Sequence, residues 1–371
     1  MISRRRFTGK LAWLGAAASM GAERALAQRS LLERKAPPGM VWLNANENPD
    51  GPCPAAIKAM SEALPLAWRY HYQEMPDVYA AIARNEQLEP AQVLVGAGSA
   101  EILHIAVDAF TSPTRPLITP VPTFEAPIDI TAALGRKVIR VPLTKDYAAD
   151  VRRLAEEATR AGGGVIYLCN PNNPTANLTP KAEVAWLAQN LPRDTVLLVD
   201  EAYLHFVEGY EEISALPYVR QGKEVVVTRT FSKIYGMAGL RVGFGCARPD
   251  LIQRMRPFRA GVISYVSARA VLAALEEGPR PIAERRARLA RVRGGLCEWL
   301  RQKKLGYIEP QANFMMIDVG RDVRELGQAL WEKGIAVGRP FPPLDHMLRV
   351  TIGAEQDMAK FRAAFEQVYF G

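Results

Sequence analysis

The sequence has no run of about 18 uninterrupted apolar residues, the length that a membrane-spanning helix requires. It has only four cysteines and four histidines among 371 residues. The cysteines Cys53, Cys169, Cys246 and Cys297 show no paired spacing, and the histidines do not cluster. We therefore expect neither a disulfide framework nor a metal site. Internal repeats and low-complexity linkers are also absent from the sequence.

Charge is distributed unevenly along the chain. The formal net charge is +8, and the first 27 residues contribute +4 of it, which leaves a modest excess for the rest. The most basic later stretch, residues 285–293, has five arginines on a segment whose apolar residues repeat at helical spacing. Because aromatic residues are not interleaved with these arginines and no nucleic-acid motif is present, we predict a solvated helix face and no nucleic-acid partner.

Residues 1–27 have the order of an export signal. Arg4-Arg5 precedes Phe7, a mildly apolar run covers Leu11–Ala22, and Ala25-Leu26-Ala27 offers small residues at alternate positions for a signal peptidase. Paired arginines before a weakly hydrophobic run resemble a twin-arginine signal. We predict a periplasmic or otherwise exported protein without stable membrane anchoring. The alternatives are a basic tail, or a cytoplasmic protein whose signal is not used.

From about residue 90, short apolar runs alternate with amphipathic segments. This rhythm predicts an α/β fold with a mostly parallel central sheet covered on both faces. The expected strands are Val93–Val95, Val165–Leu168, Thr195–Val199 and Glu224–Val227. In such folds the chemistry lies at the carboxyl ends of the strands, which is where the motifs below occur.

Four segments are predicted along the chain. Residues 1–27 form the export signal, and residues 28–65 an N-terminal segment that packs with the small domain. Residues 66–272 form the large, cofactor-binding domain, and residues 273–371 a smaller α+β domain. The last boundary follows a change of rhythm, since a long predicted helix replaces the alternation there.

Thr230-Phe231-Ser232-Lys233 directly follows a predicted strand. A lone lysine there is most often a surface residue. Pyridoxal phosphate (PLP), however, requires one lysine amine to bind its aldehyde and then to transfer protons. Thr230 and Ser232 offer hydroxyls to a phosphate, and Arg241, eight residues after Lys233, offers a guanidinium suited to the same anion.

Two further motifs end the neighbouring strands. Asp200 ends one strand, where a carboxylate would keep the pyridine nitrogen of PLP protonated, and Tyr203 could donate to the phenolic oxygen. Asn173 lies in an Asn- and Pro-rich segment after the preceding strand and could bond the same oxygen. Taken alone, Asp200 would be a strand-ending turn residue and the asparagine-rich segment an ordinary turn.

The fourth motif is glycine-rich. Gly96-Ala97-Gly98-Ser99 lies between a strand and a predicted helix, where backbone N–H groups are exposed to an anion. Phe124 follows the next apolar run and could stack on a pyridine ring. A single glycine-rich loop of this kind is weak evidence, but the order of all four motifs is specific.

In this order the motifs resemble the fold-type-I aminotransferases of class I/II, and most of all the histidinol-phosphate aminotransferase branch. The resemblance begins near residue 40 and reaches the C-terminus. Its branch-specific parts are residues 43–49 (LNANENP), Arg69-Tyr70, Asn313-Phe314 and residues 348–353 (LRVTIG).

The resemblance implies a ping-pong transamination between an amino donor and a 2-oxo acid, in a homodimer with shared sites. Lys233, Asp200 and Tyr203 would be the catalytic residues. The implied cofactor-binding residues also include Gly98, Ser99, Phe124, Asn173, Thr230, Ser232, Arg241 and, from the neighbouring subunit, Tyr70 or alternatively Tyr72. Arg349, Arg339 and Asn46 would bind the substrate, whose anionic group is a carboxylate or a phosphate.

Some positions depart from the family pattern, and other activities stay open. Ala176 replaces the usual glycine after Asn-Pro-Thr, Pro127 replaces a frequent tyrosine, and residues 337–343 are rich in proline. These departures concern the substrate more than the cofactor, so histidinol phosphate is one candidate donor. A racemase, lyase or decarboxylase on the same fold is the alternative enzyme, and a non-catalytic PLP-fold module is the alternative of another class.

Overall fold

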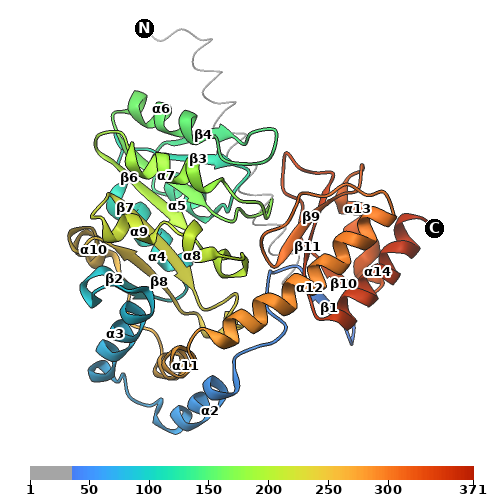
Figure 1. Ribbon diagram of the computed structural model, residues 1–371, viewed down its shortest axis with the longest axis horizontal. Helices are drawn as coiled ribbons and strands as arrows, with labels where there is room; N and C mark the ends of the chain where they lie inside the picture. Colours follow the sequence, from blue (N-terminus) through green and yellow to red (C-terminus); the bar gives the residue numbers. More distant parts are fainter. Residues whose placement is uncertain (1–35) are drawn as a thin grey trace.

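A seven-stranded sheet forms the centre of the larger part of the molecule (Figure 1). The computed structural model describes residues 36–371, so the signal predicted for residues 1–27 lies outside the described residues. The strand order is β2-β8-β7-β6-β5-β3-β4, and β8 runs antiparallel to both of its neighbours while the other pairs are parallel. The predicted α/β class with a mostly parallel sheet is confirmed. The strands are β2 (Val93–Gly96), β3 (Leu117–Val121), β4 (Val138–Pro142), β5 (Gly164–Cys169), β6 (Thr195–Asp200), β7 (Val225–Thr230) and β8 (Gly243–Ala247).

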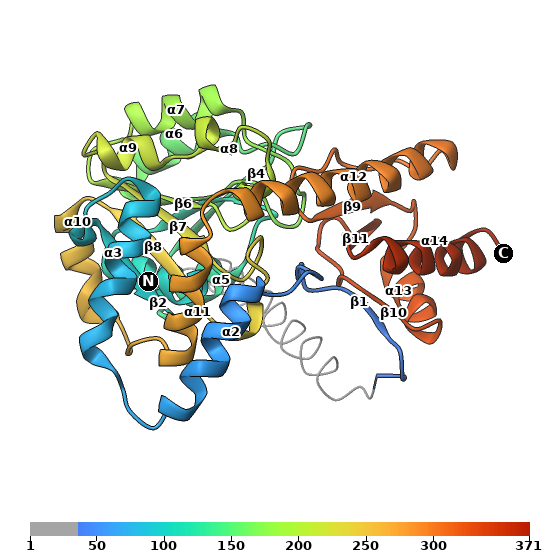
Figure 2. The ribbon, with the colours of Figure 1, turned by 60° about the horizontal axis from the view of Figure 1, so that its bottom comes forward.

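Helices cover both faces of this sheet (Figure 2). On one face lie α4 (Ser99–Phe110), α5 (Ala126–Ala133) and α10 (Pro249–Met255). On the other lie α3 (Met75–Glu86), α6 (Val151–Ala161), α7 (Lys181–Gln189) and α9 (Leu216–Arg220). Because strand residues alternate between faces, Leu198 packs in the cluster on the α4 side, whereas Leu197 and Val199 pack in the cluster on the α6 side.

Helix α6 illustrates how local sequence sets the ends of an element. The Asp150 side chain accepts a hydrogen bond from the backbone N–H of Arg153 at 3.0 Å, which caps the first turn. Gly162 ends the helix with a φ of 73°, a left-handed conformation that glycine adopts without steric cost. The apolar stripe between these ends packs against the sheet.

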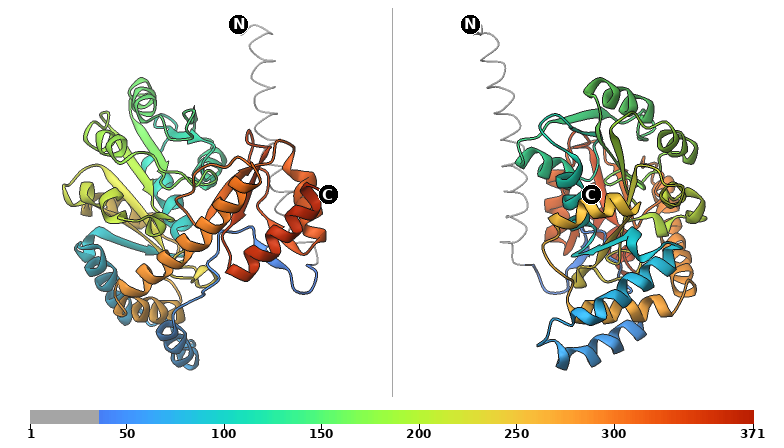
Figure 3. Two further views of the ribbon diagram at one scale, coloured as in Figure 1. Left: turned by 45° about the vertical axis from the view of Figure 1, so that its right-hand side comes forward. Right: turned by 90° about the vertical axis from the view of Figure 1, so that its left-hand side faces the viewer.

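The smaller part contains two short sheets and three helices (Figure 3). Strand β9 (Phe314–Asp318) pairs antiparallel with β11 (Met347–Thr351), and β1 (Val41–Leu43) pairs in parallel with β10 (Ile335–Val337). The helices are α12 (Arg280–Gln302), α13 (Val323–Glu332) and α14 (Glu355–Tyr369). The N-terminal segment therefore contributes β1 to this part, while its helix α2 (Pro54–Ala63) packs against α11 (Tyr265–Glu276).

The arginines of α12 are less solvated than the sequence predicted. Arg288 and Arg291 are exposed, but Arg285, Arg286 and Arg293 are half-buried and donate hydrogen bonds to backbone carbonyl oxygens of other segments. The guanidinium groups thus tie α12 to both parts of the molecule, a use that helical periodicity alone does not distinguish from solvation.

The remaining elements are short. They are α8 (Tyr210–Ile213) and the 3₁₀ helices η1 (Leu64–Leu66), η2 (Tyr72–Glu74), η3 (Pro90–Gln92), η4 (Leu204–Phe206), η5 (Ala238–Leu240) and η6 (Arg256–Phe258). Between residues 36 and 371, no helix is both long enough and apolar enough to cross a membrane.

Candidate active site

A cavity of about 270 Å³ lies where the carboxyl ends of β6 and β7 meet the N-terminus of α4. Its lining includes Ser99, Phe124, Asp200, Thr230, Lys233 and Arg241. These residues come from five separate stretches of the chain, and parallel strands bring them to one edge of the sheet. Tyr203 and Ser232 also line it, so eight of the sequence-predicted residues share one cavity.

One end of the cavity is rich in donors. The Thr230 hydroxyl is 3.0 Å from the Ser232 hydroxyl, and Arg241 Nη1 donates to that same Ser232 oxygen at 3.2 Å. Arg241 Nη2 lies near the carbonyl oxygen of Ala97 at 3.5 Å. Two hydroxyls and a guanidinium thus converge beside the start of α4, a combination suited to a phosphate group.

Glycine is required where α4 begins. A Cβ added to Gly98 would lie 2.3 Å from Arg241 Nη2, and the φ of this residue is +83°. A Cβ added to Gly243 would lie 2.1 Å from the backbone nitrogen of Ser99. The absence of these side chains lets the guanidinium and the helix N-terminus approach each other, which forms a cradle for an anion.

Asp200, the last residue of β6, presents a buried carboxylate. Its Oδ1 accepts hydrogen bonds from the Thr228 hydroxyl at 3.1 Å and the Ala202 N–H at 3.2 Å, and its Oδ2 accepts one from Tyr167 at 3.3 Å. Burial raises the pKa of Asp200 to about 6, and these hydrogen bonds oppose the shift. A cationic ring nitrogen facing this carboxylate would compensate for its desolvation.

Lys233 follows β7 and reaches across to the N-terminal segment. Its Nζ donates to the backbone carbonyl oxygens of Ala45 at 3.2 Å and Asn46 at 3.0 Å. Burial lowers the pKa of Lys233 to about 8, and the positive charge of Arg349 adds to this effect. The amine is therefore neutral more often than an exposed lysine, as a nucleophile must be.

Tyr203 and Asn46 connect this lysine to the smaller part. The Tyr203 hydroxyl is 3.1 Å from Asn46 Nδ2, and the tyrosine ring centroid is 5.5 Å from Lys233 Nζ. The backbone N–H of Asn46 donates to the Thr351 hydroxyl at 2.9 Å, and the Asn46 carbonyl oxygen also accepts from Asn313 at 3.0 Å. Asn46 thus fixes the backbone against which the lysine amine rests.

Arg349, in β11, presents a buried guanidinium. Nη1 donates to Asn173 Oδ1 at 2.8 Å and Nη2 to the carbonyl oxygen of Asn44 at 2.6 Å, while Nε is buried and has no hydrogen-bond partner. Burial lowers the pKa of Arg349 to about 10. A buried cation with an unused donor calls for an anionic partner.

Arg339 is engaged differently. Its Nη2 forms an ion pair with Glu125 Oε2, and its Nη1 donates to the carbonyl oxygen of Pro340 at 2.9 Å. Glu125 directly follows the cavity residue Phe124, so Arg339 does lie beside the site. Tyr70 does not reach the cavity of its own chain, because its side chain is 73% exposed on the segment after α2.

Several residues of the site were missed in the sequence. Tyr167 and Thr228 orient the Asp200 carboxylate, and Glu125 holds Arg339. Asn313, which the sequence marked only as part of the family resemblance, supports Asn46. Thr228 could have been found, because it lies two residues before Thr230 and thus on the same face of β7. Glu125 and Asn313 depend on contacts between distant segments, which the sequence pattern does not report.

PLP fits this set of groups. The donor cradle suits its phosphate, the buried Asp200 suits its pyridine nitrogen, and Lys233 lies in the same cavity for its aldehyde. The Nε of Arg349 is buried and has no hydrogen-bond partner.

Comparison with known proteins gives one consistent result. The family model of aminotransferase class I and II matches residues 38–368. The histidinol-phosphate aminotransferase of Symbiobacterium thermophilum is 33% identical over 88% of this chain and 90% of its own length. The aromatic amino acid aminotransferase of Cutibacterium acnes is 32% identical over 86% of this chain and 90% of its own length. The crystal structure of the Sinorhizobium meliloti histidinol-phosphate aminotransferase in complex with pyridoxal-5'-phosphate superposes with a TM-score of 0.80 at 26% identity, covering 89% of this chain and 91% of that one.

Proposed function

Because the chain belongs to the class I and II aminotransferase family, we propose that the cavity around Lys233 is the active site of a transamination. The protein is a PLP-dependent aminotransferase, which takes an amino group from a donor and gives it to a 2-oxo acid. The observation that carries the site assignment is the junction of Lys233, Asp200 and the Arg241 cradle in one cavity.

Each group has a defined task. Thr230, Ser232 and Arg241 would hold the cofactor phosphate together with the N-terminus of α4, and the buried Asp200 carboxylate would pair with the ring nitrogen. When bound, PLP supplies the electron sink that makes the α-hydrogen of the substrate acidic. Asp200 keeps its negative charge more readily once a cation faces it.

Lys233 moves the proton. Its depressed pKa provides a neutral amine near physiological pH, and this amine can accept the α-hydrogen of the donor and release it on the cofactor side. Asn173 accepts a hydrogen bond from Arg349, and Tyr203 lines the cavity; both would orient the phenolic oxygen of the cofactor. The second half-reaction reverses these proton movements with a 2-oxo acid.

Arg349 fixes the substrate. Its buried guanidinium with an unbonded Nε supports binding of a carboxylate or a phosphate, and holding that group leaves the α-hydrogen as the labile bond. This geometry favours transamination over decarboxylation. The names of the relatives in S. thermophilum and C. acnes suggest histidinol phosphate and aromatic amino acids as the two donor classes to compare.

The site is completed by a second copy of the chain. The segment from Leu64 to Tyr72 exposes Leu64 by 62%, Trp68 by 80% and Tyr70 by 73%, a patch of apolar surface that suits a subunit interface. In a homodimer, Tyr70 would reach the cofactor phosphate of the partner subunit, in keeping with the resemblance of Arg69-Tyr70 to the family motif.

Export is part of this proposal, although the signal lies outside the described residues. If Arg4 and Arg5 address the folded protein for twin-arginine export, replacing both by lysine will retain it in the cytoplasm of a host that has this route. Equal export of both forms in cell fractionation would refute this part.

Absorption spectroscopy tests the active site. The protein incubated with PLP is expected to show the visible band of lysine-bound cofactor, and amino donors should bleach it. Lys233→Ala should lose the band, whereas Lys137→Ala, an exposed lysine, should keep it. A band that persists in the Lys233 variant would overturn the assignment.

A further inference from the structure

A second guanidinium, that of Arg339, lies near Arg349, and its charge is compensated by an ion pair with Glu125. The Phe341 ring centroid lies 4.6 Å from the guanidinium carbon of Arg349 and 4.2 Å from that of Arg339. One aromatic ring thus contacts both cations, which places Arg339 next to the substrate-binding arginine. Two free guanidinium groups this close would bind a substrate with two anionic groups.

Glu125 changes that expectation. It precedes α5 in the larger part, directly after the cavity residue Phe124, and its carboxylate pairs with Arg339 of the smaller part. The Glu125 side chain is 19% exposed and that of Arg339 29%, so water screens this pair only partly. Arg339 and Glu125 act in opposite directions on the pKa of Arg349, so the pair presents little net charge toward it.

We propose that Glu125 is a specificity residue that restricts the enzyme to donors with a single negative charge, namely α-amino acids with uncharged side chains. Arg349, which packs against the buried Phe341 ring, binds the one carboxylate, and Phe124 offers an apolar ring in the cavity lining. A second carboxylate or a phosphate would meet the Glu125 carboxylate, and Arg339 could bind it only by breaking an existing ion pair. This inference rests on the proposed aminotransferase function.

The test compares donors in a single turnover of the holoenzyme. The wild type is expected to react faster with phenylalanine than with glutamate or histidinol phosphate. Glu125→Gln, which frees Arg339, should raise the rate with both dianionic donors roughly 10-fold to 100-fold, the value of a charge-assisted hydrogen bond. The ratio of the rate with glutamate to the rate with phenylalanine should therefore rise by a similar factor. The double variant Glu125→Gln/Arg339→Gln should lose the gain, and Asp129→Asn, at an exposed carboxylate in α5, should behave as wild type.

Binding of unreactive acids separates this inference from the activity itself. By calorimetry, wild-type holoenzyme should bind 3-phenylpropanoate more tightly than glutarate, and Glu125→Gln should gain affinity for glutarate alone. Equal or tighter binding of glutarate by the wild type, or a Glu125 variant without such a gain, would overturn the inference. If donors leave the cofactor spectrum unchanged while the binding preference holds, the proposed function fails and the charge selectivity stands.

Discussion

Lys233 and Asp200 show how burial changes the pKa of single residues. Both are surrounded mostly by protein, and desolvation shifts both toward their neutral forms, with a pKa of about 8 for Lys233 and about 6 for Asp200. For Lys233 the shift supplies the nucleophile. For Asp200 the same burial makes the charged carboxylate unfavourable. A protonated pyridine nitrogen would compensate for this, so Asp200 favours cofactor binding while lowering the stability of the apoprotein.

The pH dependence of cofactor uptake tests the state of Lys233. Only the neutral amine attacks an aldehyde, so the rate of PLP uptake by the apoprotein should rise with pH and level off above a pH of about 8. The positive charge of Arg349 contributes to the low pKa, and its removal should raise the pKa. Stopped-flow absorbance of Arg349→Gln should therefore show the profile moved to higher pH.

Arg324→Gln is the matched control for that measurement. Arg324 is an exposed arginine of α13 that pairs with Asp322 and Asp345. Its variant should retain the wild-type profile. If the Arg349 variant also retained it, the electrostatic account of the lysine would be wrong.

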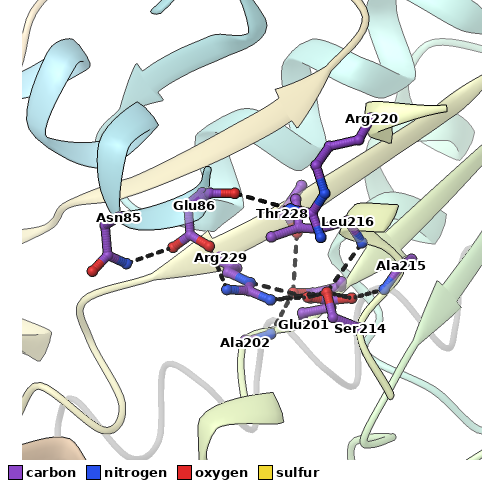
Figure 4. A network of polar contacts seen from close by, with 11 residues as sticks. Asn85, Glu86, Glu201, Ala202, Ser214, Ala215, Leu216, Arg220, Thr228 and Arg229 are labelled. Atoms are coloured by element: carbon purple, nitrogen blue, oxygen red, sulfur yellow. Dashed lines mark hydrogen bonds and ion pairs between the residues drawn. The ribbon is translucent and has the colours of Figure 1, made fainter. Parts of the chain in front are cut away.

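At the scale of elements, the two faces of the sheet at β6 and β7 have different roles: one carries residues of the active site and the other a buried ion-pair cluster. Strand alternation places Thr228 and Thr230 on the α4 face near the cavity and Arg229 on the opposite face. Figure 4 shows Arg229 between the carboxylates of Glu86 and Glu201, at 2.6 Å and 2.8 Å, with all three side chains at most 4% exposed. This ion-pair cluster fixes β7 against the end of α3 directly behind the cofactor-binding residues.

Breaking the cluster should be costly. Arg229→Met leaves two buried carboxylates without their cation, and we expect the free energy of unfolding to fall by about 3–5 kcal/mol. Urea denaturation of the apoprotein measures this change. The triple variant Glu86→Gln/Arg229→Met/Glu201→Gln should lose less, because it removes the charges together. A single variant within about 1 kcal/mol of wild type would show that the cluster contributes little.

At the scale of the whole molecule, the active site is closed by contacts between its two parts. Arg349 of the smaller part bonds Asn173 of the larger part at 2.8 Å, and Arg339 pairs with Glu125. Asn46 on the N-terminal segment bonds Tyr203 on one side and Thr351 on the other. Substrate binding at Arg349 therefore acts on the same groups that hold the two parts together.

The proposed dimer is also tested at this scale. Trp68 is 80% exposed in a segment that we place at the subunit interface. Trp68→Glu should yield a monomer in sedimentation equilibrium and should weaken PLP affinity, since Tyr70 would no longer reach the partner's site. Phe370→Glu, at an exposed aromatic near the C-terminus, is the control and should remain dimeric. A monomeric wild type would contradict the proposal.

Much of the fold could be predicted because its signals are local. The apolar runs at Val165–Leu168 and Thr195–Val199 lie inside β5 and β6. Lys233, Asp200 and Arg241 could be found because each follows or ends a strand in a fixed order. The pairing of Arg339 with Glu125 could not be predicted, since the two residues are 214 positions apart and Glu125 lies in no motif with a fixed spacing.

The sequence by itself determined the α/β class, the family and the residues suited to PLP, because strand periodicity and strand-end motifs are encoded over a few consecutive residues. Only the tertiary structure decided which charged side chains are paired with each other and which are buried without a partner. It gave Arg349 an unpartnered Nε and Arg339 a carboxylate, and it lowered the pKa of Lys233 by burying it. Desolvation and ion pairing depend on which distant side chains meet, and in this protein that pairing bears on which substrate the shared chemistry accepts.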